Sequence, residues 1–477
     1  MKYIIVILLL ISSISFGQQG IVWDSEISVS DGTTYGRFRP RMALTDNDVP
    51  VVVYGNSIGL YVSRWNGVDF DTPVSIMPSG METYISGWTG PDIASKGDTV
   101  IVVFKQMPLT TGNVYSVRST DGGITFSDTI RVDAHDIGVA WMPSVEMDEL
   151  GNPVVSYMVH GSNWSNPDYV IAQSFDTGLN YTSEIDITTS IPGEVCDCCP
   201  SEMVINGSRR ALLFRNNESN LRNMFAVMSI DDGTSYTSQE DVDYTNWTTN
   251  SCPSTGPDGV FFNNELLTAF TSGASGNRRV NLSSSDVTSG IVYANTYSID
   301  DASLNQDYPR IAISNDTIVM VWREYFGTSS DVIISVATQG NYNQLLAEGV
   351  GASESFIGVQ TNPDVLINNG VVYLCFQDEE TGDVRFRTGS VNSVVSVEKI
   401  DESLSFSIYP NPSNTGEYVI NGVIPSSIQI VDALGVVVNH ESNDINTVKI
   451  KNPIKGIYFI TAQTENGDSI VEKIILN

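Results

Sequence analysis

Positively charged residues are scarce in this chain of 477 residues. It contains 24 lysines and arginines against 56 aspartates and glutamates, which gives a formal net charge of −32 at pH 7. Such a surface repels phosphate backbones, so we expect no nucleic-acid partner. Histidine is scarcer still, and His135, His160 and His440 form no metal-ligand pattern in the sequence. We therefore predict no cofactor and no histidine-based metal centre.

Long apolar runs are also missing, apart from one at the start. Residues 3–14 are mainly apolar, follow Lys2 and precede Ser15-Phe16-Gly17. Residues 1–17 are therefore predicted to be a secretory signal peptide. No later stretch reaches the roughly 18 apolar residues that a membrane span needs. No cysteine follows the signal to carry a lipid, so we expect an exported, soluble mature chain without a transmembrane segment.

Cysteine is rare and unevenly distributed. Cys196, Cys198, Cys199 and Cys252 lie in one region of the chain, whereas Cys375 lies alone in an apolar run. An exported chain meets oxidising conditions, so the four clustered cysteines are predicted to form two disulfides. Binding of Cu(I) or Zn by their thiolates is the alternative, although adjacent Cys198 and Cys199 are awkward for a tetrahedral site. Cys375 is expected to be a buried, inert thiol.

Helical periodicity is absent, and a repeat of strand-like segments takes its place. Seven times a proline is followed, 13 or 14 residues later, by an aromatic residue that ends an apolar run. A period of about 50 residues with strand-like content is typical of a β-propeller, with one four-stranded blade per repeat. The pairs are Pro40/Tyr54, Pro91/Phe104, Pro143/Tyr157, Pro200/Phe214, Pro257/Phe270, Pro309/Trp322 and Pro363/Phe376.

The last repeat is one strand short. After Pro363 it supplies three strand-like segments, and residues 21–29 at the other end of the mature chain resemble a closing strand. Pairing of the two ends in one blade would close the ring and leave few exposed sheet edges. We therefore predict an all-β fold with a seven-bladed β-propeller over residues 20–392. Six blades are the alternative.

A second pattern, Ser-x-Asp-x-Gly-x-x-aromatic, occurs in three successive repeats. The aspartate can accept backbone N–H bonds within a turn, and the glycine permits a positive φ. The pattern resembles the Asp-box (BNR) hairpin of sialidase-like propellers, which implies a structural role rather than a catalytic one. The residues are Ser119, Asp121, Gly123, Phe126, Ser174, Asp176, Gly178, Tyr181, Ser229, Asp231, Gly233 and Tyr236.

In a propeller, residues just before each repeat proline and just after each repeat aromatic are expected to surround one central opening. Cationic residues there would suit a carboxylate or another anionic group, and aromatic residues would suit the faces of sugars. The cationic candidates are Arg39, Lys105, Arg215 and Arg323. The aromatic candidates for ligand binding are Trp88, Trp141 and Tyr308.

The resemblance to sialidases implies a more specific site. Sialidases bind the carboxylate of sialic acid with three arginines and use a tyrosine nucleophile assisted by a glutamate. Here the resemblance implies that Arg39, Arg215 and Arg323 form the clamp, with Tyr325 and Glu324 beside the third arginine. The segment around Arg39 lacks the isoleucine of the family's Arg-Ile-Pro motif, and seven blades depart from the usual six.

Two functions follow from these patterns. One is a secreted or cell-surface propeller that binds or processes a glycan or glycoprotein through its cationic opening; an enzyme of this kind would be an exo-sialidase-type glycoside hydrolase. The other is a non-catalytic binding or adhesion propeller whose loops are braced by disulfides.

The pattern changes after about residue 390. Residues 393–404 are predicted to be a linker. Residues 405–477 contain Tyr409-Pro410-Asn411-Pro412, then short strand-like runs, and end in Lys473-Ile474-Ile475-Leu476-Asn477. This segment resembles the type A C-terminal sorting domain of the type IX secretion system of Bacteroidetes. The resemblance implies a small β-sandwich, a partner in the type IX machinery, and delivery across the outer membrane to the medium or the cell surface.

Overall fold

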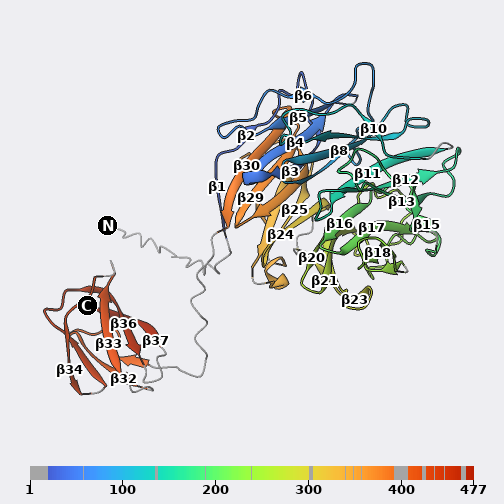
Figure 1. Ribbon diagram of the computed structural model, residues 1–477. Coiled ribbons are helices and arrows are strands. Elements are labelled where there is room, and N and C mark those ends of the chain that lie inside the picture. The colour runs from blue at the N-terminus through green and yellow to red at the C-terminus, as the bar shows by residue number, and fades with distance from the viewer. Residues whose placement is uncertain are drawn as a thin grey trace, which may run out of the picture. The chain divides into compact units, whose positions relative to one another are not determined.

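The computed structural model describes residues 20–391 and 407–477, with short gaps. The gaps are residues 57, 135–137, 189, 238, 300–303, 339, 347–348, 356, 422–425, 434–435, 445 and 464–468. The chain divides into two compact units between residues 392 and 393 (Figure 1). The predicted signal peptide and linker both lie outside the described residues.

The described residues are almost entirely β-strands, loops and turns. The two helical segments among them are single 3-10 turns, Asp46–Asp48 and Tyr342–Gln344. The prediction of an all-β chain is confirmed. In this described part of the chain, no helix has the length and apolar character needed to cross a membrane.

The first unit is built from antiparallel sheets of four or five strands, and all but the last of them are each formed by one stretch of the chain. The first four sheets contain β3 (Phe38–Thr45), β4 (Val49–Gly55), β5 (Leu60–Arg64) and β6 (Val74–Ser75); β7 (Asp92–Lys96), β8 (Thr99–Lys105), β9 (Val114–Ser119) and β10 (Ile130–Arg131); β11 (Val139–Met147), β12 (Pro153–His160), β13 (Asp168–Gln173) and β14 (Ile185–Asp186); β15 (Glu194–Val195), β16 (Glu202–Asn206), β17 (Arg209–Asn217), β18 (Met224–Ser229) and β19 (Glu240–Asp241).

Three further sheets complete the first unit as it is described. They contain β20 (Asp258–Phe262), β21 (Glu265–Ser272), β22 (Arg279–Asp286) and β23 (Val292–Ser298); β24 (Gln306–Ser314), β25 (Thr317–Phe326), β26 (Ser329–Ala337) and β27 (Val350–Gly351); β28 (Gln360–Asn368), β29 (Val371–Asp378) and β30 (Asp383–Val391), joined by β1 (Ile21–Trp23) and β2 (Ile27–Ser28).

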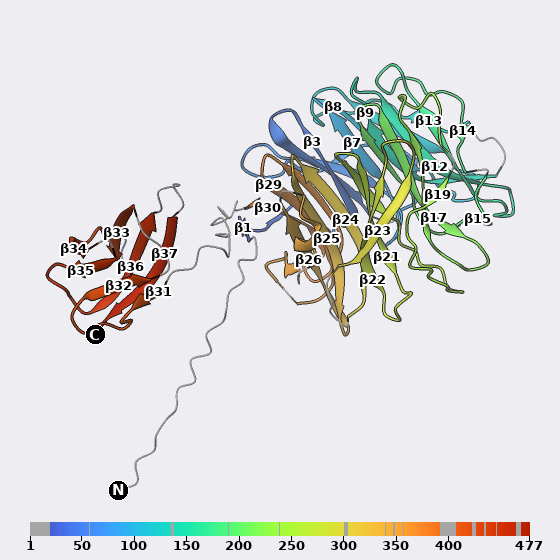
Figure 2. The same cartoon turned by 90° about the horizontal axis from the view of Figure 1, so that it is seen from below.

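The sheets are arranged as a closed ring. The first strand of each repeat contacts the first strand of the next, with β16 as the inner strand of the fourth sheet, and β28 of the last sheet contacts β3 of the first. Both ribbon views show this closure, because the blue β3 lies beside the orange strands of the last sheet (Figures 1 and 2). Radial repetition of small antiparallel sheets is the architecture of a β-propeller.

The two ends of this unit meet in the last sheet. Ile21 pairs with Val391 and Trp23 with Gly389, and Ile27 pairs with Phe386 farther along β30. The predicted pairing of the N-terminal segment with the last repeat is therefore confirmed, although two short strands replace the single one expected. This pairing covers the outer edge of β30, which would otherwise expose unpaired backbone groups.

The repeat aromatics lie in the core between neighbouring sheets. Each ends an apolar run in the second strand of its repeat, and the residues just before it in that run are buried. Their full burial explains why an aromatic recurs at this place, since these side chains fill the space between two twisted sheets. Those with no exposed surface are Tyr54, Phe104, Tyr157, Phe214, Phe270, Trp322 and Phe376.

Aspartates directly after three of the repeat prolines each tie one sheet to the next. Asp92 accepts a hydrogen bond from the backbone N–H of Val145 at 2.8 Å, and Asp258 accepts one from Ile311 at 2.7 Å. Asp364 does the same for Met42 at 2.8 Å. The innermost strands have no further strand beside them, so these carboxylates satisfy N–H groups that would otherwise be buried without a partner.

Residues directly before several repeat prolines have an unusual backbone. Arg39, Met142, Tyr308 and Asn362 have φ values of 50°, 52°, 51° and 49°, and each lies at a register shift in its strand pair. Left-handed backbone is uncommon for non-glycine residues, and a bulge re-aims the side chain that it carries. The bulges thus hold Arg39 and Tyr308 in positions that a regular strand would not give them.

The three Ser-x-Asp-x-Gly turns repeat one set of hydrogen bonds. Asp121 accepts the backbone N–H of Thr125 at 2.9 Å, and Ser119 accepts the N–H of Gly123 at 2.9 Å. Asp176 and Asp231 accept the equivalent N–H groups, also at 2.9 Å. Each aspartate thus accepts a backbone N–H within its own turn. Gly123, Gly178 and Gly233 all have a positive φ, which is +87° at Gly123. Glycine adopts this backbone conformation without the steric cost that a side chain would add.

The second unit is small and wholly β in its described residues. Its two antiparallel sheets enclose one hydrophobic cluster that includes Tyr418, Ile430, Val448, Ile460 and Ile474. The strands are β31 (Ser407–Tyr409), β32 (Glu417–Asn421), β35 (Thr447–Ile450) and β34 (His440–Asp444) in one sheet, and β33 (Ser427–Asp432), β36 (Gly456–Gln463) and β37 (Ser469–Leu476) in the other.

Candidate functional site

Two cavities lie beside the bulged residues. The smaller, of about 30 Å³, is lined by residues from several repeats, including the predicted site residues Arg39, Trp88 and Tyr308. The larger, of about 330 Å³, is lined by Tyr308 again, by Arg323 and by polar side chains such as Asn362. Tyr308 therefore links the two cavities. The structure brings these predicted residues to one place, although Arg39 and Arg323 line different cavities.

Arg39 is the least satisfied cation of this region. Its backbone N–H donates to Gln377, but its side chain makes no ion pair within the described residues, and its Nε is buried without a hydrogen bond. Burial, together with the neighbouring Arg41 and Arg310, lowers the pKa of Arg39 to about 9. An anion bound in the cavity would accept a hydrogen bond from Nε and neutralise the charge of Arg39.

Trp88, which lines the same cavity, also has a buried hydrogen-bond donor without an acceptor. Its Nε1–H is buried and has no acceptor in the described part of the chain. Gly90 leaves room for the stem of Arg39, because a Cβ at this glycine would lie 3.2 Å from the Cγ of that side chain. Two buried donors without acceptors thus line one small cavity.

Arg323 is, by contrast, fully engaged. It binds Asp307 through two hydrogen bonds of 2.7 Å each, and its guanidinium stacks on Tyr308 and Tyr325 at 4.5 and 4.4 Å from the ring centroids. Burial opposes its charge, but the bonds to Asp307 outweigh that effect and raise the pKa of Arg323. It also donates to Thr361 at 2.9 Å.

The predicted pair of Tyr325 and Glu324 is not formed. The Tyr325 hydroxyl donates to Asp307 at 3.1 Å, whereas Glu324 accepts from Gln306 at 2.7 Å. Successive residues of β25 point to opposite faces of the sheet, so the two side chains cannot meet. Burial and the nearby Asp307 raise the pKa of Tyr325, which makes the hydroxyl a poorer nucleophile at neutral pH.

Arg215 does not join Arg39 and Arg323, so the predicted clamp of three arginines is not assembled. Its guanidinium donates to the carbonyls of Arg222 and Thr271 at 2.6 and 2.7 Å and lies 5.2 Å from the ring centroid of Trp247. It has no exposed surface and lines neither cavity. Arg222 lies in the loop between β17 and β18 of the same repeat, and Thr271 lies in β21 of the next repeat, so the side chain is held between two sheets.

Lys105 and Trp141 also lie away from the two cavities. The Lys105 ammonium is buried and donates to the carbonyl of Gly112, and burial lowers its pKa to about 8. The indole N–H of Trp141 donates to Nε2 of His160 at 2.9 Å. Neither residue lines the cavities that contain Arg39 and Tyr308. Both therefore serve local packing in this structure.

A buried ion cluster, two of whose residues, Arg310 and Glu202, line the smaller cavity, was missed by the sequence analysis. Arg310 lies 2.8 Å from Glu202, 3.3 Å from Asp258 and 3.0 Å from Asp364. Burial raises the pKa of Glu202 to about 8, although the nearby Arg310 opposes this shift. The signal was present, because Arg310, Asp258 and Asp364 each follow a repeat proline directly.

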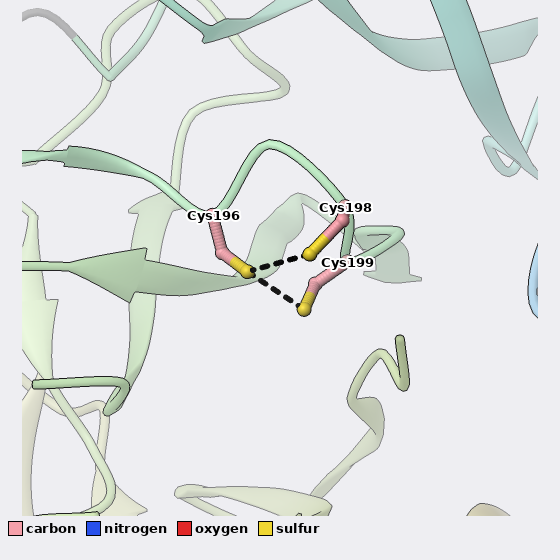
Figure 3. A group of neighbouring side chains, drawn as sticks. All are labelled: Cys196, Cys198 and Cys199. Carbon is pink, nitrogen blue, oxygen red and sulfur yellow. Dashed lines mark hydrogen bonds between the residues drawn. The ribbon is translucent and has the colours of Figure 1, made fainter. Parts of the chain in front are cut away.

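The cysteine cluster contains one of the two predicted disulfides, between Cys198 and Cys252. Cys196 and Cys199 are free and buried, with their Sγ atoms 2.8 Å apart (Figure 3). The prediction of a second disulfide is not met by this pair of thiols. A soft metal could use Cys196, Cys198 and Cys199 only if the disulfide were reduced. Cys375 is a buried free thiol, as predicted.

Comparison with known proteins identifies the second unit. Residues 407–477 match the family model described as the secretion system C-terminal sorting domain. The predicted type IX sorting domain is therefore confirmed over this range, and it marks the chain for export across the outer membrane to the surface or the medium. Among curated proteins, nothing matches the chain.

Solved structures similar to this chain share little sequence with it. A protein of unknown function from Dyadobacter fermentans is 10% identical, with 78% of this chain and 99% of that chain covered and a TM-score of 0.49. The GH93 α-L-arabinofuranosidase of Fusarium graminearum is 11% identical, with 77% and 98% covered and a TM-score of 0.44. The NanB sialidase from Streptococcus pneumoniae is 11% identical, with 64% and 67% covered and a TM-score of 0.45. These similarities do not define an activity for this chain.

Proposed function

We propose that the seven sheets are the blades of a secreted or cell-surface propeller that binds acidic glycans through the cavities around Arg39 and Tyr308. The observation that carries this proposal is the pair of unsatisfied donors, Arg39 Nε and Trp88 Nε1, in one cavity. A carboxylate group accepts hydrogen bonds from both kinds of donor and neutralises the arginine.

The larger cavity has the volume and the lining groups to hold the ring and the hydroxyl groups of a sugar. Its volume of about 330 Å³ lies within the range of small-molecule sites, which begins at about 300 Å³. The ring of Tyr308 offers an apolar face, and Thr361, Asn362 and Gln377 offer polar groups for hydroxyls. An acidic sugar would place its carboxylate at Arg39 and its ring beside Tyr308.

Binding without turnover is favoured over sialidase chemistry. The clamp of three arginines lacks Arg215, and Tyr325 is not paired with Glu324. One observation keeps a glycoside hydrolase as the second candidate: the Tyr325 hydroxyl lies 3.1 Å from a carboxylate oxygen of Asp307 and beside Arg323. A tyrosine next to a carboxylate is the arrangement that tyrosine-based glycosidases require.

A binding experiment with the full mature chain tests the proposal. Sialyllactose and a galacturonate oligosaccharide would be titrated against the wild type, Arg39→Met and Arg209→Met by calorimetry. Arg209 is a suitable control because it stacks on Phe261 and donates to the carbonyl of Asn263, away from both cavities. We expect Arg39→Met to weaken binding at least tenfold, which corresponds to about 1.4 kcal/mol, and Arg209→Met to bind normally.

Two outcomes would decide against this function. Equal affinity of the wild type and Arg39→Met for acidic sugars would show that the site lies elsewhere. Tighter binding of neutral sugars than of acidic ones would contradict the proposed contact between Arg39 and a carboxylate. Release of product from a fluorogenic sialoside, abolished in Tyr325→Phe, would instead establish the hydrolase.

A further inference from the structure

The cysteine cluster places free thiols against a disulfide. Cys196 Sγ lies 2.8 Å from Cys199 Sγ and 3.6 Å from Cys198 Sγ, and Cys198 is already bonded to Cys252 (Figure 3). Cys196 and Cys199 are buried, whereas Cys252 is exposed. A thiol next to a disulfide sulfur has the contact that thiol–disulfide exchange needs.

Two arginines surround this group of sulfur atoms. Arg222 donates to Cys196 Sγ at 3.2 Å, and Arg215 lies close enough to favour negative charge on both free cysteines. Burial opposes a thiolate at Cys199, but the hydrogen bond from Cys196 and the charge of Arg215 lower its pKa to about 7. Burial and the neighbouring Cys199 raise the pKa of Cys196 well above its usual value, so Cys196 carries the proton that lies between the two sulfur atoms. Cys199 Sγ, 2.8 Å away, is the nearest acceptor for that proton when Cys196 reacts.

We propose that these four cysteines form a thiol–disulfide exchange site whose exposed product, the Cys252 thiolate, is a reversible attachment point for a low-molecular-weight disulfide. Cys196 passes its proton to the Cys199 thiolate and bonds to Cys198 Sγ. The Cys198–Cys252 bond breaks, and Cys252 leaves as a thiolate. One disulfide and one thiolate are present before and after this step, so no external oxidant is required.

The second step takes place at the surface. The Cys252 thiolate attacks a disulfide of the form R–S–S–R, forms a Cys252–S–S–R bond and releases one R–S⁻. The attached group is thus linked through the one exposed sulfur of the cluster. Of the two original free thiols only Cys199, which is buried, then remains, because Cys196 and Cys198 form the new internal disulfide.

The test measures attachment to Cys252 in the native, full mature chain. Oxidised glutathione is the probe, and the peptides are mapped by mass spectrometry after acid quenching without reductant. We expect glutathione on Cys252 in the wild type and in Cys375→Ser, and none in Cys196→Ser. In Arg222→Met, attachment should be about threefold slower, because loss of the positive charge reduces thiolate formation.

The number of thiols in the untreated protein provides a second measurement, independent of the variants. Alkylation after unfolding should label three thiols per chain, because Cys198 and Cys252 are bonded to each other and the other three of the five cysteines, Cys196, Cys199 and Cys375, are free. A single labelled thiol would show that Cys196 and Cys199 form a static disulfide and would overturn the proposal. Attachment at Cys252 that persists in Cys196→Ser, or no attachment in the wild type, would overturn it as well.

Discussion

Single side chains after the repeat prolines do two tasks at once. Asp258 accepts the N–H of Ile311 and also lies 3.3 Å from Arg310. It therefore satisfies a backbone donor of the next sheet and neutralises a buried cation. The two tasks can be separated, because asparagine keeps an acceptor oxygen but has no charge.

We expect Asp258→Ala to lower the free energy of unfolding by about 3–5 kcal/mol, because it leaves Arg310 with one partner fewer and a buried N–H unpaired. Asp258→Asn should lower the free energy of unfolding by less, because asparagine still offers an acceptor oxygen to the N–H of Ile311. Urea unfolding followed by tryptophan fluorescence measures both. The control is Asp316→Ala in the exposed turn after β24, which should change the free energy by less than about 0.5 kcal/mol. Equal effects at positions 258 and 316 would contradict this account of the ring.

The aspartates of the Ser-x-Asp-x-Gly turns make the stability of these turns depend on pH in the acidic range. Hydrogen bonds from the side chain and backbone of Asn180 lower the pKa of Asp176 to about 2, and Ser235 has the same effect on Asp231. Each folded-state pKa lies below the ordinary value of 3.8. The stabilisation is therefore fully present above about pH 4 and is lost as the pH falls towards 2.

Asp176→Ala should lower the Tm by roughly 1–3 °C at pH 7, and the difference from the wild type should shrink as the pH approaches 2. Thermal unfolding followed by circular dichroism at several pH values measures both. Asp128→Ala is the control, since Asp128 is exposed and, within the described residues, accepts a bond from Ser127 through its backbone carbonyl. A difference that does not depend on pH would contradict the role of the ionised carboxylate.

At the scale of the whole first unit, the pairing of β1 and β2 with β30 closes the ring of sheets and is expected to stabilise it. A chain that begins at residue 30 loses these strands and the contact of Trp23 with Arg387. We expect its Tm to fall by at least about 5 °C, and we expect it to self-associate through the open edge of β30. Scanning calorimetry and light scattering measure the two effects.

The control for this truncation is a chain that ends at residue 391 and keeps β1. It lacks the second compact unit and, of the first, only Asn392, so its main unfolding transition should be unchanged. A monomeric truncated chain with the Tm of the wild type would show that closure by β1 contributes nothing to stability.

The fold could be predicted from the sequence to a greater extent than the site could. The prolines, the buried aromatics and the Ser-x-Asp-x-Gly turns act through local geometry, so their spacing indicates the repeating sheets. The position of Arg215 depends on carbonyls of Arg222 and Thr271, which no local pattern reveals. Strand alternation could have separated Tyr325 from Glu324 before the structure was known.

The pairing of Ile21 with Val391 also has a consequence in time. The first strand leaves the ribosome, or enters a new compartment, before its partner exists there. Until β30 arrives, β1 has no neighbour to bind, and a contact between such distant residues forms slowly. The last sheet must therefore be completed late, so arrest of synthesis or translocation before residue 383 should leave an unfinished ring that proteases can cut.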